Sequence, residues 1–154
     1  MSATPSFEAL VWTDGACQGN PGPGGWAAIV CRPDGSETEL CGGLAHTTNN
    51  VMEMTAALEG MRFLPPGSDI CVVTDSRYVC DGMTSWMAGW LRRGWKTAGG
   101  KPVKNQELWQ ALAAECQRHA AVRWKWVRGH VGNALNERAD VLAVGAAARA
   151  ATAA

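Results

Sequence analysis

The sequence predicts an α/β fold in which a five-stranded mixed sheet, made of an antiparallel meander plus parallel strands, is flanked by helices. Three strand-like segments follow one another near the start of the chain, joined by turns rich in glycine and proline. Helical and strand-like segments then alternate, which is typical of crossovers that place parallel strands in one sheet. With 154 residues, the chain is expected to form a single domain over residues 1–154, with frayed tails at about 1–7 and 149–154.

The meander is predicted from three segments. "ALVWTD" (9–14) and "WAAIVCR" (26–32) are rich in aromatic and branched apolar residues, and "SETELCGGL" (36–44) follows the turn "PDG". The segment between the first two strands is dense in glycine and proline, and we expect a loop there. These residues are Gly19, Pro21, Gly22, Pro23, Gly24 and Gly25. The three strands are therefore expected to pair antiparallel.

The rest of the chain alternates between helical and strand periods. Met54, Leu58 and Met61 recur at helical spacing, and Pro65 and Pro66 end that helix. The later segments are a buried parallel strand at 69–76, a helix with Val79, Met83, Trp86 and Trp90 on one stripe, a helix at 106–119, a strand at 121–127 and a final helix from 137.

Composition excludes several classes of protein. The hydrophobic fraction of 47% is that of a globular protein, and no apolar run approaches the roughly 20 residues needed to span a membrane. The start "MSATPSFEAL" lacks the charged and apolar regions of a signal peptide. The six cysteines form no C-x-x-C pair and are expected to be reduced. A cytoplasmic enzyme or binding protein with no membrane partner is the resulting expectation.

Two predicted strands end alike, in "LVWTDG" at Asp14 and "CVVTDS" at Asp75. A single Asp at a strand end is usually a turn or capping residue. Functional groups of α/β sheets also collect at strand ends, so two matching acids on neighbouring strands would lie close together.

Glu53 allows two interpretations. "NVME" fits a capping box in which Asn50 is the N-cap and Glu53 only satisfies the helix start. Glu53 also begins a face with Ala57, Gly60 and Leu64 that is otherwise small or apolar, and a carboxylate on such a face needs a compensating partner such as a cation.

Asp140 is expected in the first turn of the last helix, with Asn136 as N-cap, where an acid is favoured by the helix dipole. If Asp14, Glu53, Asp75 and Asp140 converge, their mutual repulsion requires positive charge. Ligation by oxygen alone suits Mg²⁺ or Mn²⁺, and two such ions about 4 Å apart suit phosphodiester hydrolysis.

The net charge is zero, from 14 basic and 14 acidic residues, but the charges are unevenly distributed. No acid lies between Asp81 and Glu107, a stretch that contains five cations. They are Arg92, Arg93, Lys96, Lys101 and Lys104. Such a block, interleaved with tryptophans, favours contact with nucleic-acid phosphates. Of the tryptophans, Trp86 and Trp90 are expected to lie mostly in the core and Trp95 to be the better candidate for contact.

Five motifs together resemble bacterial type I ribonuclease H, over roughly residues 8 to 148. They are "TDGACQGNPGPGGWA", "TTNNVMEMTAALEGM", "VVTDSRYV", "WLRRGWKTAGGKPVKNQELW" and "KWVRGHVGNALNERADVLA". The resemblance implies an endonuclease that cuts the RNA strand of RNA–DNA hybrids and leaves 5′-phosphate and 3′-hydroxyl ends. It also implies a monomer that uses two Mg²⁺ ions, with Mn²⁺ as a substitute.

The resemblance places the catalytic and metal-binding acids at Asp14, Glu53, Asp75 and Asp140, and a mobile histidine that assists proton transfer or product release at His130. It implies minor-groove contacts near the acids and grip of the DNA strand by the basic block. The implied nucleic-acid-binding residues are Cys17, Asn20, Thr48, Asn49, Asn50, Arg77, Trp86, Arg92, Arg93, Trp95, Lys96, Lys101, Lys104 and Asn105. Asn49 and Asn50 fit plain helix capping as well.

The chain departs from the family pattern at two positions. Arg77 stands where the family often has Gln, and Val144 stands where many members carry a basic residue four positions after the last catalytic Asp. Two rival functions remain at this level: a nuclease of the same fold that acts on DNA, because fold alone does not set substrate, and a non-enzymatic module that binds hybrids.

Overall fold

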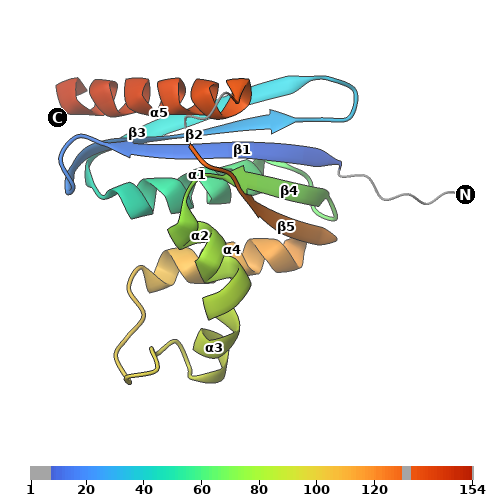
Figure 1. Ribbon diagram of the computed structural model, residues 1–154, viewed down its shortest axis with the longest axis vertical. Coiled ribbons are helices and arrows are strands. Elements are labelled where there is room, and N and C mark those ends of the chain that lie inside the picture. The colour runs from blue at the N-terminus through green and yellow to red at the C-terminus, as the bar shows by residue number, and fades with distance from the viewer. Residues whose placement is uncertain (1–7, 130–132, 154) are drawn as a thin grey trace, which may run out of the picture.

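The computed structural model describes residues 8–129 and 133–153 and contains one five-stranded sheet with strand order β3-β2-β1-β4-β5 (Figure 1). The strands are β1 (Ala9–Cys17), β2 (Gly22–Cys31), β3 (Glu37–Thr47), β4 (Asp69–Thr74) and β5 (Ala121–Trp126). β1, β2 and β3 pair antiparallel, whereas β4 pairs parallel with both β1 and β5. The predicted mixed sheet is confirmed.

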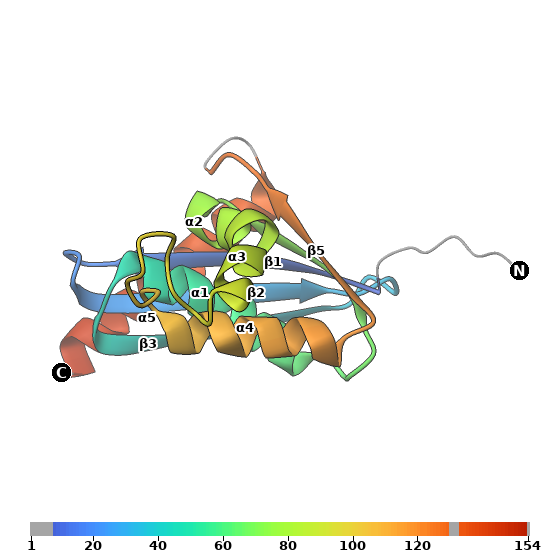
Figure 2. The same ribbon diagram turned by 90° about the horizontal axis from the view of Figure 1, so that it is seen from below.

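Helices cover both faces of this sheet. The α-helices are α1 (Asn49–Phe63), α2 (Arg77–Asp81), α3 (Met87–Arg92), α4 (Gln106–Arg118) and α5 (Ala134–Ala153). α5 packs on the three antiparallel strands from one side, while α1 lies on the opposite side and α4 packs against it (Figures 1 and 2). The main apolar core lies between the sheet and these two helices, where Val11, Val72 and Met54 are fully buried.

The glycines and prolines after β1 are used differently from the predicted loop. β2 already begins at Gly22, four residues earlier than the predicted strand, because Gly24 and Gly25 pair with Cys17 and Ala16 of β1. A Cβ on Gly25 would lie 2.3 Å from the carbonyl oxygen of Ala143 in α5. The lack of a side chain there lets α5 approach the sheet closely.

The helix predicted after β4 is interrupted. A π-helical turn, η1 (Gly82–Trp86), separates α2 from α3. Its wider turn shifts the helical register, so the predicted stripe of Val79 and Trp90 is buried but Trp86 is 40% exposed. The expectation that Trp86 lies mostly in the core is therefore wrong.

α5 also differs from the prediction at both ends. It begins at Ala134, where Asn133 Oδ1 accepts hydrogen bonds from the N–H groups of Leu135 and Asn136. Asn133, rather than Asn136, is thus the capping residue, and Asp140 is the seventh residue of the helix rather than part of its first turn. The helix continues through Ala153, so residues 149–153 are helical and not the predicted frayed tail.

All six cysteines are free, and none of the helices in the described part of the chain is long and apolar enough to cross a membrane.

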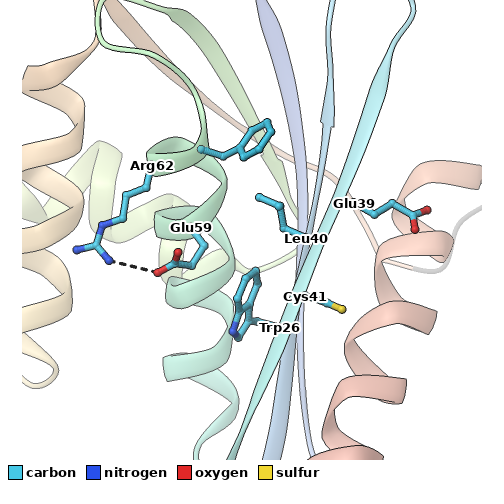
Figure 3. Close-up of a pocket in the computed structure, with 7 residues that line it drawn as sticks. Trp26, Glu39, Leu40, Cys41, Glu59 and Arg62 are labelled. Carbon is cyan, nitrogen blue, oxygen red and sulfur yellow. Dashed lines mark hydrogen bonds and ion pairs between the residues drawn. The ribbon is translucent and has the colours of Figure 1, made fainter.

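A surface hollow of about 490 Å³ lies between α1 and the β2–β3 edge, lined by Trp26, Leu40 and Phe63 among others (Figure 3). None of the four predicted catalytic acids lines it.

Candidate active site

Asp14 and Asp75 lie at the point where β1 and β4 part. The parallel pairing of these strands ends with Thr13 opposite Thr74, so the residue that follows each threonine is one of the two acids. Asp14 does not end its strand as predicted, because β1 continues to Cys17 in its pairing with β2. The prediction that the two acids lie close together is confirmed, because their carboxylate oxygens are within 4.8 Å of each other.

Glu53 reaches the same place from α1. Thr48 caps this helix, with its hydroxyl oxygen accepting from the N–H of Val51 at 3.2 Å, so the capping box between Asn50 and Glu53 is wrong. The sheet-facing interpretation is correct: Glu53 is 5% exposed and Ala57 is fully buried. The carboxylate of Glu53 is therefore not needed for the helix start and lies inside the protein.

These acids form one cluster. Asp14, Glu53 and Asp75 each offer a carboxylate oxygen, and the three oxygens lie within 4.8 Å of one another. Burial, followed by the negative charge of Asp75, raises the pKa of Asp14 to about 8, with Asp140 acting in the same direction and the Gly15 N–H against it. Burial and the charges of Asp14 and Asp75 raise the pKa of Glu53 well above its usual range. The cluster thus opposes its own ionisation.

Asp140 approaches the cluster from α5 on the other face of the sheet. It acts on the carboxyl group of Asp14 through its charge, which places it beside that residue. The three-acid group within 4.8 Å does not include it. The site therefore combines β1, β4, α1 and α5, with Asp140 at its margin.

The chemistry of this donor set fits a divalent metal ion. Asp14 Oδ1 accepts from the Gly15 N–H at 2.8 Å, but Asp14 Oδ2 and Glu53 Oε1 are buried with no donor among the described residues. A buried carboxylate oxygen without a donor is costly, and a cation between such oxygens removes that cost. Hard oxygen ligands of this kind suit Mg²⁺ or Mn²⁺.

The turn after β1 is tied to the start of α1. Asn20 Oδ1 accepts from the N–H of Asn49 at 2.9 Å. The thiol of Cys17 lies 3.0 Å from the carbonyl oxygen of Gly19 and 3.4 Å from that of Thr47. The structure thus brings together the predicted groove-contacting residues Cys17, Asn20 and Asn49, with Thr48 and Asn50 adjoining them in sequence.

Arg77 and Trp126 form a pair that sequence reasoning found only in part. The guanidinium carbon of Arg77 lies 4.2 Å from the centroid of the Trp126 ring, and the Trp126 indole N–H donates to the backbone carbonyl of Asp75 at 3.1 Å. Trp126 was not predicted as a site residue. Trp126 is the last paired residue of β5 and lies opposite Thr74, the residue before Asp75. An alignment of the two strands in this register would have placed Trp126 beside the acid.

The predicted basic block projects away from the sheet on α3 and the loop that follows it (Figure 1). The loop folds back on itself. The N–H of Val103 donates to the backbone carbonyl of Trp95 at 3.2 Å, and Lys96 and Pro102 form an antiparallel β-bridge. Val103 is buried and anchors the loop. The five cations of the block are exposed at this projection: Arg92, Arg93, Lys96, Lys101 and Lys104.

The tryptophans of the projection differ in exposure. Trp95 is half-buried, has a positive φ of 67° and packs beside Trp90, with ring centroids 6.3 Å apart. Trp86 carries the exposed ring. Asn105, at the start of α4, also has a positive φ and donates to the Tyr78 hydroxyl at 3.1 Å.

His130 lies outside the described residues, and Gly129 is the last described position before it. A Cβ on Gly129 would lie 2.6 Å from Asp75 Oδ2. The backbone at Gly129 therefore lies against the carboxylate of Asp75, and a larger residue there would require that carboxylate to move.

Comparisons with known proteins match one family over most of the chain. The family model for RNase H matches residues 7–148. The ribonuclease H of Hyphomonas neptunium is 58% identical over 133 residues, covering 86% of this chain and 87% of its own. That of Xanthomonas campestris is 57% identical with the same coverage.

Solved structures share the fold. LC9-RNase H1, a type 1 RNase H with the type 2 active-site motif, superposes with a TM-score of 0.82 at 38% identity, covering 96% of this chain and 75% of that one. The N-terminal RNase H domain of rv2228c from Mycobacterium tuberculosis gives a TM-score of 0.71 at 26% identity, covering 96% of this chain and 99% of that one. The acidic cluster, the fold and these matches together establish that the chain belongs to the ribonuclease H family of nucleases.

Proposed function

We propose that this protein, as a single ribonuclease H domain, hydrolyses the RNA strand of RNA–DNA hybrids with two divalent ions and leaves 5′-phosphate and 3′-hydroxyl ends. The observation that carries the proposal is the convergence of Asp14, Glu53 and Asp75 within 4.8 Å in a chain of this family. Asp140 completes the set from α5.

In this mechanism the four acids hold the ions. Asp14 is fixed by the Gly15 N–H through Oδ1, which leaves Oδ2 as the buried ligand, and Glu53 contributes Oε1. When bound, Mg²⁺ supplies an activated water nucleophile and neutralises charge that develops on the attacked phosphate. His130 is proposed to move a proton during cleavage or to assist product release, which suits a side chain that titrates near neutral pH.

Selection of RNA requires contact with the 2′-hydroxyl, the group that distinguishes the two sugars. The tied turn of Cys17, Asn20 and Asn49, with Asn50 beside it, supports such contacts. The backbone N–H of Asn49 donates to Oδ1 of Asn20. The Nδ2 group of Asn20 is therefore the part of that side chain proposed to donate to the RNA sugar. Thr48 and Asn105 are proposed to hold a phosphate of the DNA strand.

The basic projection is proposed to grip the DNA strand. Its cations are exposed and would neutralise phosphates, and the exposed ring of Trp86 offers a surface for a sugar or base. Because all four acids come from one chain, we further propose a monomer. Six free cysteines support a reducing compartment such as the cytoplasm.

The test is a cleavage assay with Mg²⁺ on matched hybrid, duplex DNA and single-stranded RNA. The proposal expects cutting of the RNA strand of the hybrid alone, and end-labelling should show 5′-phosphate products. Asp14→Asn and Asp75→Asn are expected to abolish cutting while hybrid binding persists. Cleavage of duplex DNA would favour the rival DNA nuclease, and parental rates in either variant would contradict the metal-site assignment.

A further inference from the structure

The chain around Asp75 is held by hydrogen bonds from the end of β5 and from the residue that follows it. β4 ends at Thr74, whose carbonyl accepts from the N–H of Val127 at 2.9 Å, and the next carbonyl, that of Asp75, accepts from the Trp126 indole at 3.1 Å. The N–H of Ser76 donates to the Thr74 hydroxyl at 2.9 Å. The position of the Asp75 backbone therefore depends on a side chain of the neighbouring strand.

The face of the Trp126 ring is in contact with a cation. Arg77 is the exposed first residue of α2, and its guanidinium lies over the Trp126 ring at 4.2 Å. Within residues 8–129 and 133–153, no carboxylate forms an ion pair with Arg77. A guanidinium stacked on an indole keeps its N–H edge available, and that edge matches the two oxygens of a phosphate.

We propose that Trp126 is a positioning residue with two functions: its indole N–H sets the backbone of the metal-binding Asp75, and its ring orients Arg77 to take a phosphate of the nucleic acid beside the acidic cluster. This inference rests on the proposed function for the identity of the substrate. It links the metal site and the nucleic-acid surface through one side chain.

The two functions separate in single variants. Trp126→Phe keeps an aromatic face for Arg77 but removes the N–H donor. It should weaken Mn²⁺ binding to the nucleic-acid-free protein, measured by electron paramagnetic resonance, by about tenfold, the lower range for loss of an outer-shell partner. Hybrid affinity in EDTA should stay within about twofold of the parent. Trp124→Phe, two residues earlier on the same strand, is the matched control and should leave Mn²⁺ affinity unchanged.

The second function is measured with hybrid in EDTA, where metal binding does not contribute. Arg77→Gln should weaken binding and reduce the slope of log affinity against log salt by about 0.9, the value for one phosphate contact. Its Mn²⁺ affinity should equal the parent's. Arg149→Gln, which removes a cation from the far part of α5, should leave the slope unchanged.

The link itself is tested by combining variants. Trp126→Leu removes both the donor and the ring, so it should lower Mn²⁺ affinity and the salt slope together. Adding Arg77→Gln to it should cause little further loss of hybrid affinity, because Arg77 has already lost its platform. Circular dichroism and thermal unfolding of each variant establish that it is folded.

Three results would overturn the inference. Parental Mn²⁺ affinity in Trp126→Phe would remove the first function. An unchanged salt slope in Arg77→Gln would show that its guanidinium does not contact a phosphate. Fully additive losses in the double variant would show that the two residues act separately. Metal binding is measured without substrate, so failure of hybrid cleavage would overturn the proposed function without deciding the role of the Trp126 N–H.

Discussion

Gly15 lies against the backbone of Glu53. A Cβ on Gly15 would lie 2.6 Å from the Glu53 amide nitrogen and 2.8 Å from the carbonyl carbon of Met52. β1 and α1 therefore meet at backbone distance directly beside Asp14. This contact brings the carboxylates of Asp14 and Glu53 into one cluster.

Gly15→Ala is expected to separate β1 from α1 and disturb the acidic cluster. Overpacking of this kind costs about 1–3 kcal/mol of unfolding free energy, because neither backbone segment can move freely. Mn²⁺ affinity should fall as well, since the ligands are displaced. Gly99→Ala is the control, because its nearest atom lies 3.9 Å from the added Cβ. Equal unfolding midpoints for the two variants would contradict the expected role of the contact.

The acidic cluster should make the metal-free protein less stable as pH rises. Asp14 has a pKa of about 8 when folded and about 3.9 when unfolded, so between these values the folded state binds the extra proton. Below about pH 4 Asp14 is protonated in both states and does not change the free energy of unfolding. From there to about pH 8 the free energy of unfolding falls as pH rises, by at most about 1.4 kcal/mol per pH unit for this one proton. Thermal unfolding in EDTA across this range measures the slope.

Asp14→Asn provides the comparison for that pH dependence. It removes the titrating group and part of the repulsion on Glu53, so the slope in EDTA should become shallower. In the parent, Mg²⁺ should raise the unfolding midpoint more at pH 8 than at pH 6, because metal binding requires deprotonated ligands. A parent whose stability in EDTA rises steadily from pH 5 to 8 would contradict the raised pKa.

The basic projection should contribute to hybrid affinity through charge. Arg92→Gln combined with Lys96→Gln is expected to lower affinity and reduce the salt slope by up to about two, because each phosphate contact contributes about 0.9. Arg62→Gln with Arg149→Gln removes equal charge at other exposed positions and should change the slope little. Filter binding in EDTA over a range of KCl concentrations measures both pairs. The same slope for both pairs would show that net charge, rather than the projection, governs binding.

Val144 offers a gain of function. It is 49% exposed and lies one turn after Asp140 on α5, at a position where the family resemblance leads us to expect a basic residue. Val144→Lys should strengthen hybrid binding in EDTA and steepen the salt slope by about 0.9, because a cation would be added beside the acidic cluster. Ala148→Lys places the same charge one helical turn further from Asp140, at an exposed residue of α5, and should steepen the slope less. A slope that steepens only in the Ala148 variant would contradict the expected direction of approach.

Short-range patterns were sufficient for much of this structure. The apolar runs before Asp14 and Asp75 predicted neighbouring strands, and the face shared by Glu53 and Ala57 predicted the buried carboxylate. In each case the residues that specify the feature are adjacent or one helical turn apart, so periodicity reports them directly.

Long-range contacts were not predictable in the same way. Arg118 donates to the carbonyl oxygens of Met61 and Leu64 at the end of α1, across 54 or more residues. No local pattern specifies such a partner. The exposed ring of Trp86 depends on the π-helical turn, and the Trp126–Asp75 bond depends on the pairing of β5 with β4. These features follow from tertiary packing, which overrides local preference.

The strand order has a consequence for when this protein becomes an enzyme. Asp14 and Asp75 meet only when β1 and β4 have paired across about 60 residues, and Asp140, the last of the four acids along the chain, joins only after α5 has packed on the sheet. A domain generally folds as a unit, so the full set of acids forms only once α5 has been synthesised and can pack on the sheet. A nascent or partly folded chain therefore carries no complete metal site, and cutting begins only with the finished fold.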